Sequence, residues 1–218
     1  MIIGADQDAL ASRAARRHEA RARRSALTFA ERCATALAVS RHLGSSGWLR
    51  PGKRLAAYLA LPEEIDVSPC IAMALRQGCG IWLPRIETAS SARMSFAPAG
   101  GRLRRNVFGI PEPVTSQRLA ARWMQIVLVP LVAFDDRGAR LGMGGGYYDR
   151  ALAWRRHRSA WHGPRLVGIA HSTQRVDHIA ALAHDVGLDA VITEQGLTLF
   201  PRPAHRPPQN TRPSKDPR

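Results

Sequence analysis

Short apolar runs separated by helix-like segments set the first structural expectations for this chain. The run Ile126–Pro130 contains no polar residue, which is typical of a strand buried on both faces of a sheet. Other strands are predicted where apolar residues cluster between turn-forming residues. These predicted strands are Arg54–Leu61, Cys79–Pro84, Leu166–Ala170 and Leu188–Thr193, with a short one at Met94–Phe96.

Two helices are predicted ahead of the first strand. The segment Asp8–Ser25 is rich in Ala and Arg, which are good helix formers. The segment Thr28–Glu31 has the sequence of a capping box, so a second helix is expected to begin there. Its apolar residues at roughly helical spacing are Phe29, Cys33, Leu37 and Leu43.

A third helix is predicted between the first two strands. Ser68 is its predicted N-cap, Pro69 suits the first helical position, and Gly78 is a predicted stop. A helical turn is expected at Gln117–Ala121. The alternation of strands and helices predicts an α/β fold: a three-layer, doubly wound, mostly parallel sheet with helices on both faces.

Length and composition divide the chain into one domain and a tail. A chain of 218 residues can bury one substantial core, so a single α/β domain is expected over residues 1–200. Residues 201–218 are rich in Pro and Arg, have no hydrophobic periodicity and are predicted to be disordered. The segment Arg155–Arg165 is basic and aromatic, as an exposed helix end and loop would be.

The charge of the chain is far from neutral. A net charge of +15 favours anionic partners such as nucleotides, phosphorylated or polyglutamyl small molecules, nucleic acid or an anionic membrane. A solvated arginine-rich surface explains much of the same excess. The sequence has no zinc finger, RNP motif or helix-turn-helix pattern, and its aromatic residues are not interleaved with a basic patch. No specific nucleic-acid partner is therefore expected.

The cysteines and the apolar runs suggest a location. Cys33, Cys70 and Cys79 are odd in number and form no C-x-x-C pair, which favours neither a zinc cluster nor a disulfide framework. A reducing cytoplasm is the expected location. The longest apolar run, Ile126–Phe134, is interrupted by Pro130 and is too short to span a bilayer. No membrane partner is expected, and a monomer is expected.

The segment Arg140–Arg150 concentrates candidate chemistry. Four glycines within Gly142–Gly146 let the backbone approach a ligand closely. The segment follows a predicted buried strand, which is where open α/β folds bind ligands. No G-K-[ST] follows and G-x-G-x-x-G is not matched, so by itself the turn is more often structural than phosphate-binding. Arg140 is suited to pairing with phosphate and Asp149 to holding magnesium.

The same segment makes the sequence recognisable. Together with Val129–Asp135 and Gly138, it resembles the signature of the 5-formyltetrahydrofolate cyclo-ligases, also called 5,10-methenyltetrahydrofolate synthetases. The resemblance extends over about Leu10–Glu194. Weaker landmarks of the family occur in order at Arg13 and Arg17, at Leu59 with Glu64–Asp66, at Gly109–Pro113, and at Gln174, His184–Asp185 and Asp189.

The resemblance implies an ATP-dependent ligase that closes 5-formyltetrahydrofolate to 5,10-methenyltetrahydrofolate and releases ADP and phosphate. The formyl oxygen is a poor leaving group until it is phosphorylated, after which N10 attacks the activated carbon. Such a transfer requires positioning and charge neutralisation more than a dedicated acid or base. ATP is then a co-substrate, reduced folate the second substrate, and Mg2+ the expected cofactor.

The resemblance also implies roles for individual residues. Arg140 and Tyr148 are the expected catalytic residues. Leu59, Glu64 and Tyr147 are expected to bind the folate, and Asp149 and Asp189 to bind magnesium. The residues expected to contact ATP are Arg13, Arg17, Arg140, Leu141, Gly142, Met143, Gly144, Gly145, Gly146, Tyr147 and Tyr148.

Several alternatives remain open at the level of sequence. Relatives often carry a basic residue inside the glycine turn, where this chain has Met143 and Gly145, so arginines elsewhere must neutralise the phosphates. Glu112 is interpreted as a structural turn residue. Another small-molecule enzyme of a related α/β fold is a second hypothesis, against which the Gly-Tyr-Tyr-Asp signature argues. A basic nucleic-acid-binding protein is the third, and it rests on charge.

Overall fold

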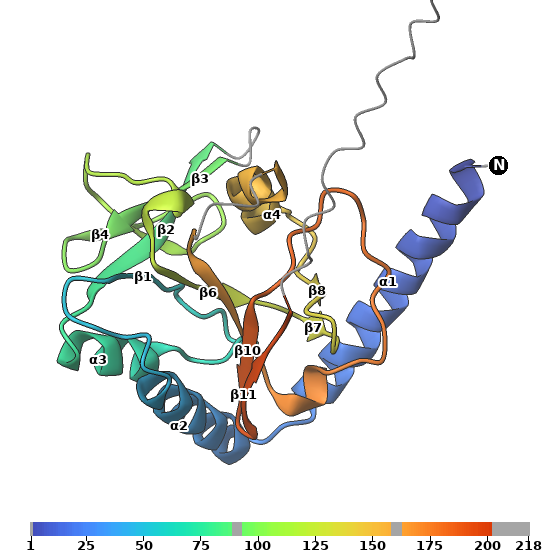
Figure 1. Cartoon of the computed structure of the whole chain (residues 1–218), viewed down its shortest axis with the longest axis horizontal. Helices are drawn as coiled ribbons and strands as arrows, with labels where there is room; N and C mark the ends of the chain where they lie inside the picture. The colour runs from blue at the N-terminus through green and yellow to red at the C-terminus, as the bar shows by residue number, and fades with distance from the viewer. Residues whose placement is uncertain (1, 89–92, 158–162, 202–218) are drawn as a thin grey trace, which may run out of the picture.

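The computed structural model describes residues 2–88, 93–157 and 163–201. Its main sheet has the strand order β11-β10-β9-β6-β1-β2-β3 (Figure 1). Neighbouring strands from β10 to β2 are parallel, while β11 and β3 run antiparallel at the two edges. The strands of this sheet are β1 Arg54–Ala56, β2 Gly80–Thr88, β3 Arg93–Pro98, β6 Ile126–Pro130, β9 Arg165–Ile169, β10 Ala190–Thr193 and β11 Gly196–Leu199.

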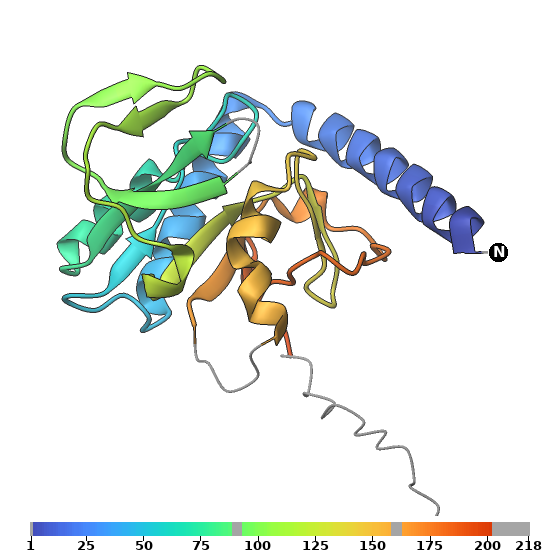
Figure 2. The same cartoon turned by 90° about the horizontal axis from the view of Figure 1, so that it is seen from above.

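Helices cover both faces of this sheet. One face carries α2 and α3, and the other carries α4 with the short 3-10 segments η1 and η2 (Figures 1 and 2). These elements are α2 Phe29–Ser45, α3 Ser68–Arg76, α4 Tyr147–Leu152, η1 Ala121–Trp123 and η2 Ala153–His157. The predicted three-layer, mostly parallel α/β fold is therefore confirmed.

The remaining elements surround one end of the sheet. The long helix α1, Ile2–Ser25, lies beside the hairpin of β7 and β8 and beside η3 (Figure 1). A second hairpin, formed by β4 and β5, extends beyond β2 (Figure 2). The bounds are β4 Leu103–Arg105, β5 Pro111–Pro113, β7 Ala133–Phe134, β8 Arg140–Leu141 and η3 Ser172–Gln174.

Alternation along the strands divides the core into two layers. In β6, Leu128 packs with α2 and α3, whereas Val127 and Val129 pack on the side of α4. Successive side chains of a strand point to opposite faces, so a strand buried on both sides needs apolar residues at every position. That is why the polar-free run beginning at Ile126 identified the central strand from sequence.

Helix α2 begins where the capping box predicted. The Thr28 hydroxyl accepts a hydrogen bond from the Glu31 amide at 3.2 Å, and the Glu31 carboxylate accepts one from the Thr28 amide at 2.7 Å. The predicted apolar face of this helix was wrong, however. Phe29 and Leu37 are 82% and 55% exposed, and Cys33 is exposed too, although Leu43 is buried. The helix is buried instead through Ala36, Val39 and Leu43.

Several helices and strands also begin or end at residues other than those predicted. The first strand ends at Ala56 instead of Leu61, because the following residues leave the sheet and Tyr58 donates to the carbonyl oxygen of Ile65 at 3.2 Å. Val67 is the N-cap of α3, so Ser68 is not its cap. A 3-10 turn begins at Ala121, later than predicted. The predicted disordered tail lies outside the described residues, except Pro201.

The burial of α2 leads to a matched pair of variants. Leu43→Ala is expected to lower the free energy of unfolding by about 2–5 kcal/mol, because Leu43 is 0% exposed in the core. Leu37→Ala, made in the same helix, is expected to change it by less than about 0.5 kcal/mol. Urea denaturation of both variants measures the difference. Equal losses of stability in the two variants would mean that Leu37 is buried in solution as well.

Candidate active site

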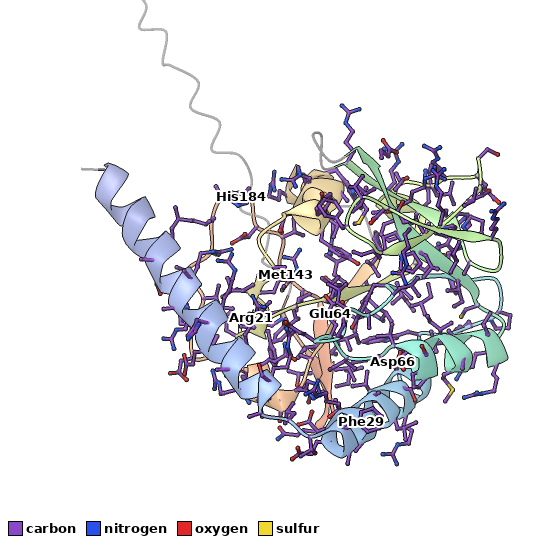
Figure 3. All side chains as sticks on the ribbon, turned by 180° about the vertical axis from the view of Figure 1, so that it is seen from behind. Arg21, Phe29, Glu64, Asp66, Met143 and His184 are labelled. Carbon is purple, nitrogen blue, oxygen red and sulfur yellow. The ribbon has the colours of Figure 1, made fainter. Side chains whose placement is uncertain are left out.

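One pocket lies at the carboxyl end of the central parallel strands. Its volume is about 400 Å³, and Pro130 at the end of β6 contributes to its floor. The walls come from α1, the loop after β1, the β4–β5 hairpin, the glycine-rich turn Gly142–Gly146 and the segment around Asp185. Figure 3 shows Glu64 and Met143 lying between α1 and the sheet. The carboxyl ends of parallel strands thus form the site, as the sequence predicted.

The glycine-rich turn depends on backbone angles that favour glycine. Gly144 and Gly146 have φ values of 101° and 63°, in the left-handed region. Gly146 is also the N-cap of α4. The guanidinium of Arg150 donates to the carbonyl oxygen of Gly145 and lies 5.6 Å from the centre of the Tyr147 ring. Arg150 and Tyr147 therefore support the turn from the side of α4.

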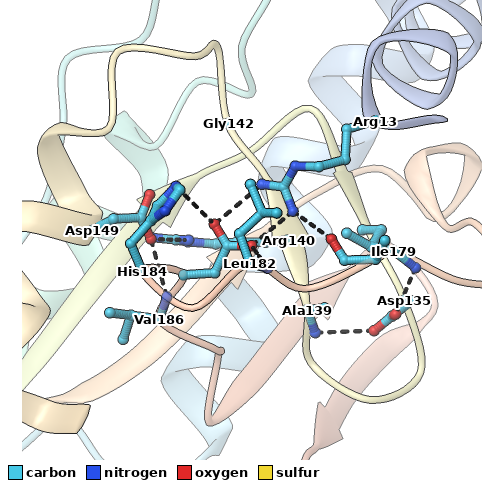
Figure 4. A network of polar contacts seen from close by, with 12 residues as sticks. Arg13, Asp135, Ala139, Arg140, Gly142, Asp149, Ile179, Leu182, His184 and Val186 are labelled. Carbon is cyan, nitrogen blue, oxygen red and sulfur yellow. Dashed lines mark hydrogen bonds and ion pairs between the residues drawn. The ribbon is translucent and has the colours of Figure 1, made fainter. Parts of the chain in front are cut away.

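A buried ion pair joins the two ends of the turn. Both terminal nitrogens of Arg140 donate to Oδ1 of Asp149, at 2.9 and 3.0 Å. The same oxygen accepts the backbone N–H of Val186 at 3.1 Å (Figure 4). The Arg140 side chain is only 4% exposed, although both partners line the pocket. Arg140 therefore anchors Asp149 as well as contributing positive charge.

Helix α1 brings three arginines to the pocket. Arg13 donates to both carboxylate oxygens of Asp185, at 2.7 and 3.1 Å, and to the carbonyl oxygen of Ala180 at 2.7 Å (Figure 4). Arg17 donates through Nε to the carbonyl oxygen of Gly142 at 3.0 Å. Arg24, three turns along the helix from Arg13, pairs with Glu63 at 2.8 Å. The helix is thus fastened to the pocket by its cations.

Arg17 differs from the other two because it forms no ion pair with the described residues. Burial and the neighbouring positive charge of Arg13 lower the pKa of Arg17. The nearby Asp185 charge raises the pKa by a smaller amount. An arginine remains charged at neutral pH all the same, so Arg17 gives the pocket an incompletely compensated positive charge beside the glycine turn.

The opposite wall carries a carboxylate and two tyrosines. Glu64 accepts the backbone N–H of Leu61 at 3.0 Å, and burial raises the pKa of its carboxyl above the ordinary value. Burial, together with the nearby Glu64 charge, raises the pKa of Tyr148 well above the ordinary value. The pKa of Tyr58 is raised in the same way. Both phenols are thus protonated hydrogen-bond donors at neutral pH.

The β4–β5 hairpin forms a wall that the sequence did not predict. Phe108 packs edge-on against Tyr147, with ring centres 6.0 Å apart. The Glu112 carboxylate accepts the backbone N–H of Ile86 and the side-chain amide of Asn106, both at 2.8 Å. Glu112 therefore fastens the hairpin to β2, in agreement with its structural interpretation. The Gly109–Pro113 motif was the only sign of this hairpin in the sequence.

Comparison with known proteins places this geometry in a family. The model of the 5-formyltetrahydrofolate cyclo-ligase family matches residues 9–194. The chain belongs to this family. It is 34% identical over 144 residues to the 5-formyltetrahydrofolate cyclo-ligase of Escherichia coli K12, covering 64% of this chain and 76% of the relative. It is 31% identical over 178 residues to that of Haemophilus influenzae, covering 79% and 92%.

Solved structures agree with the fold. The 5,10-methenyltetrahydrofolate synthetase of Aquifex aeolicus superposes with a TM-score of 0.72 at 27% identity, covering 91% of this chain and 98% of that one. The corresponding protein of Mycoplasma pneumoniae gives a TM-score of 0.64 at 22% identity, covering 84% and 98%. The latter likeness concerns the fold alone. No helix within the described residues is long and apolar enough to cross a membrane.

Membership of this family establishes which reaction the protein catalyses. The protein is a ligase of folate metabolism that converts 5-formyltetrahydrofolate to 5,10-methenyltetrahydrofolate, and the family uses ATP as co-substrate. The predicted enzyme class and function are confirmed. The hypothesis that the chain is a different small-molecule enzyme of a related fold is no longer needed.

The residues predicted for ATP and folate largely gather in the pocket. Arg13, Arg17, Arg140 and the run Gly142–Tyr148 line it, together with Leu59 and Glu64. Leu141 is fully buried and contributes to the apolar cluster beneath α1 instead of the pocket wall. The sequence missed Asp185, which lines the pocket although it had been noted only as a family landmark.

Asp189 lies elsewhere. Its carboxylate pairs with Arg155 at 2.9 Å and accepts the backbone N–H of Leu166 at 2.8 Å, and it is not among the residues that line the pocket. Arg155, expected to be exposed, has a side chain only 17% exposed because of this pair. The structure thus does not bring Asp189 together with Asp149. Within the described residues, no group of three or more His, Cys, Asp or Glu side chains is placed to hold a metal.

Two glycines of the turn provide a test of its backbone strain. A Cβ atom on either Gly142 or Gly144 would meet nothing within 4 Å, but only Gly144 has a positive φ, of 101°. Gly144→Ala is therefore expected to lower the free energy of unfolding by about 1–2 kcal/mol, and Gly142→Ala by much less. Thermal or urea unfolding of both variants measures this. Equal effects would show that the turn relaxes to ordinary angles.

Proposed function

We propose that the pocket binds ATP and 5-formyltetrahydrofolate together, with the ATP phosphates at the glycine-rich turn and the folate along the opposite wall. The observation that supports this is the continuity of the pocket. A single space of about 400 Å³, within the usual range for ligand sites, is lined both by Gly142–Gly146 and by Leu59 and Glu64. Both substrates would then meet in one enclosure.

Glu64 is the proposed anchor for the pterin ring. The amino and ring N–H groups of a pterin form an edge of donors, which a carboxylate can accept. The Glu64 carboxylate receives a bond from the Leu61 amide and otherwise faces a pocket wall of Leu59 and the tyrosines. Because burial raises its pKa, an unoccupied Glu64 carboxylate is costly in this wall. Donors from a bound pterin would compensate for that cost.

The ATP phosphates are proposed to lie against Arg17. In the absence of a basic residue within the turn, neutralising charge must come from neighbouring elements. Arg13 and Arg140 are already paired with Asp185 and Asp149, so their net contribution is small. Arg17 carries no such partner among the described residues. Backbone N–H groups of the open glycine turn would add donors to the same oxygens.

This arrangement suits the chemistry of the reaction. The formyl oxygen attacks the γ-phosphorus of ATP, ADP departs, and the oxygen becomes part of a phosphate ester. N10 then attacks the activated carbon and loses its proton, the bond from that carbon to the former formyl oxygen breaks, and phosphate leaves with this oxygen and takes up the proton. The charge that develops on the transferred phosphoryl group is stabilised mainly by Arg17. Tyr148, protonated at neutral pH, is a hydrogen-bond donor beside these oxygens.

Asp149 and Asp185 are proposed as the carboxylates for magnesium, with Asp185 in place of Asp189. Both line the pocket, and the amide of Val186, next to Asp185, bonds Asp149. The hydrogen bonds that described residues donate to Asp149 all reach Oδ1, which leaves Oδ2 for a metal. Both oxygens of Asp185 accept from Arg13, so Asp185 would bind the ion through a remaining lone pair of Oδ1. Magnesium prefers such hard oxygen ligands and would neutralise phosphate charge when bound.

The location in a reducing cytoplasm and the monomeric state of the protein remain predictions from the sequence.

A direct assay tests the reaction itself. Purified protein mixed with 5-formyltetrahydrofolate, magnesium and ATP is expected to form the methenyl product, followed by its near-ultraviolet absorbance. Omission of ATP is expected to abolish the signal. Product formed at the same rate without ATP would contradict the phosphorylated intermediate.

Two neighbouring arginines on α1 test the ATP site. Arg17→Ala is expected to raise the KM for ATP about tenfold or more, since charge-assisted bonds to phosphate contribute about 1.5–3 kcal/mol. Arg16→Ala removes the same charge from the same helix, but Arg16 does not line the pocket. It should leave the KM for ATP unchanged. Steady-state kinetics at saturating folate decide between them, and equal effects would argue for a general loss of positive charge.

The magnesium ligands can be separated by three matched substitutions. Asp149→Asn and Asp185→Asn are expected to shift the midpoint of a magnesium titration of activity to at least about tenfold higher concentration. Asp189→Asn is expected to leave that midpoint in place, because Asp189 lies outside the pocket and holds Arg155. A shifted midpoint for Asp189→Asn, with an unchanged midpoint for Asp185→Asn, would support Asp189 as the second magnesium ligand instead of Asp185.

A further inference from the structure

A second hollow lies at the other end of the main sheet. This hollow has a volume of about 820 Å³. Its lining includes the first residues of three parallel strands, which are Arg54 of β1, Ile126 of β6 and Arg165 of β9. The strands are parallel, so their first residues lie at the end opposite to the active-site pocket. The two spaces share none of their lining residues. The reaction described above makes no use of this hollow.

The lining of this hollow is strongly positive. It contains five cationic side chains, and no Asp or Glu is among the described residues that line it. None of the five forms an ion pair with the described residues. The five are Arg50, Lys53, Arg54, Arg122 and Arg165. Elsewhere, by contrast, Arg13, Arg24, Arg140 and Arg155 each have a carboxylate partner. Uncompensated charges gathered in a hollow create a local potential that attracts anions.

Two tryptophans complete the hollow. The guanidinium of Arg165 lies 4.1 Å from the centre of the Trp48 ring, and that of Arg122 lies 5.8 Å from the centre of the Trp123 ring. Trp123 is 46% exposed, although large apolar side chains are usually buried. An exposed ring flanked by a cation is the arrangement on which nucleic-acid bases stack. A simple inorganic anion would make no use of it.

We infer that this hollow is a binding site for single-stranded nucleic acid. The cations meet successive phosphates, and Trp123 stacks on a base. A duplex would need an element that projects into a groove, whereas this surface is concave. A membrane would need several exposed apolar side chains, whereas the exposed large apolar residue of this lining is Trp123 alone among the described ones. The sequence did not indicate such a site because its basic and aromatic residues come from three separate segments.

Fluorescence anisotropy with a labelled single-stranded oligouridylate tests this inference on the full chain. Lys53→Gln combined with Arg122→Gln is expected to lower the slope of log affinity against log salt by about 1.4, since each phosphate contact of a single strand contributes about 0.7. Trp123→Ala is expected to weaken binding at least about fivefold. Both variants should retain the wild-type cyclo-ligase rate, which also shows that they are folded.

The control removes two exposed charges elsewhere. Arg104→Gln combined with Arg137→Gln is expected to leave the affinity and the salt slope nearly unchanged, because neither residue lines the active-site pocket or the second hollow. An equal loss in this control would overturn the inference in favour of diffuse charge. Absence of binding by the wild type, or an unchanged affinity for Trp123→Ala, would overturn it too. Uridine monophosphate that competes as well per phosphate as the oligonucleotide would reassign the hollow to free nucleotides.

Discussion

The buried ion pair between Arg140 and Asp149 holds the active site in shape. It spans the glycine-rich turn, whose backbone has the most conformational freedom to lose on folding. Asp149 accepts both Arg140 nitrogens and the amide of Val186 on one oxygen, which ties the turn to the segment that carries Asp185. Removing Asp149 would leave the buried Arg140 charge uncompensated, and because Asp149 is 21% exposed the cost is expected to lie below the about 3–5 kcal/mol of a fully buried pair. The flexible turn is thus made rigid by its flanks.

Hydrogen bonds and ion pairs of arginine side chains also attach helix α1 to the domain. Among the side chains of this helix that the structure describes, from Leu10 to Ser25, Ala20 is the apolar one buried in the cluster beneath it. Its attachment relies on Arg13 bound to Asp185 and on Arg17 bound to the carbonyl of Gly142. The same side chains line the pocket. Under the proposed function, the cations that attach the helix would also bind the anionic ligands, and the arginine-rich composition acquires a structural role.

The parallel sheet also separates two kinds of site. Its carboxyl ends carry the pocket, where Arg13, Arg24 and Arg140 are paired with carboxylates, and its amino ends carry the second hollow, whose described lining residues include cations but no Asp or Glu. Trp48 and Trp123 are 75 positions apart in the chain yet line the same hollow. Along the sequence, each tryptophan has basic residues close by, but the two segments become one surface only when β1 and β6 pair side by side.

The sequence by itself determined the fold class and the location of the site. The polar-free strand Ile126–Pro130, the capping box at Thr28 and the glycine-rich turn each depend on neighbouring residues, so local pattern identified them. The buried face of α2, the presence of Asp185 and not Asp189 in the pocket wall, and the partners of Arg17 and Arg140 depend on segments far apart in the chain. Only the tertiary structure decided these, because burial and charge pairing are set by what packs against a residue and not by its neighbours in sequence.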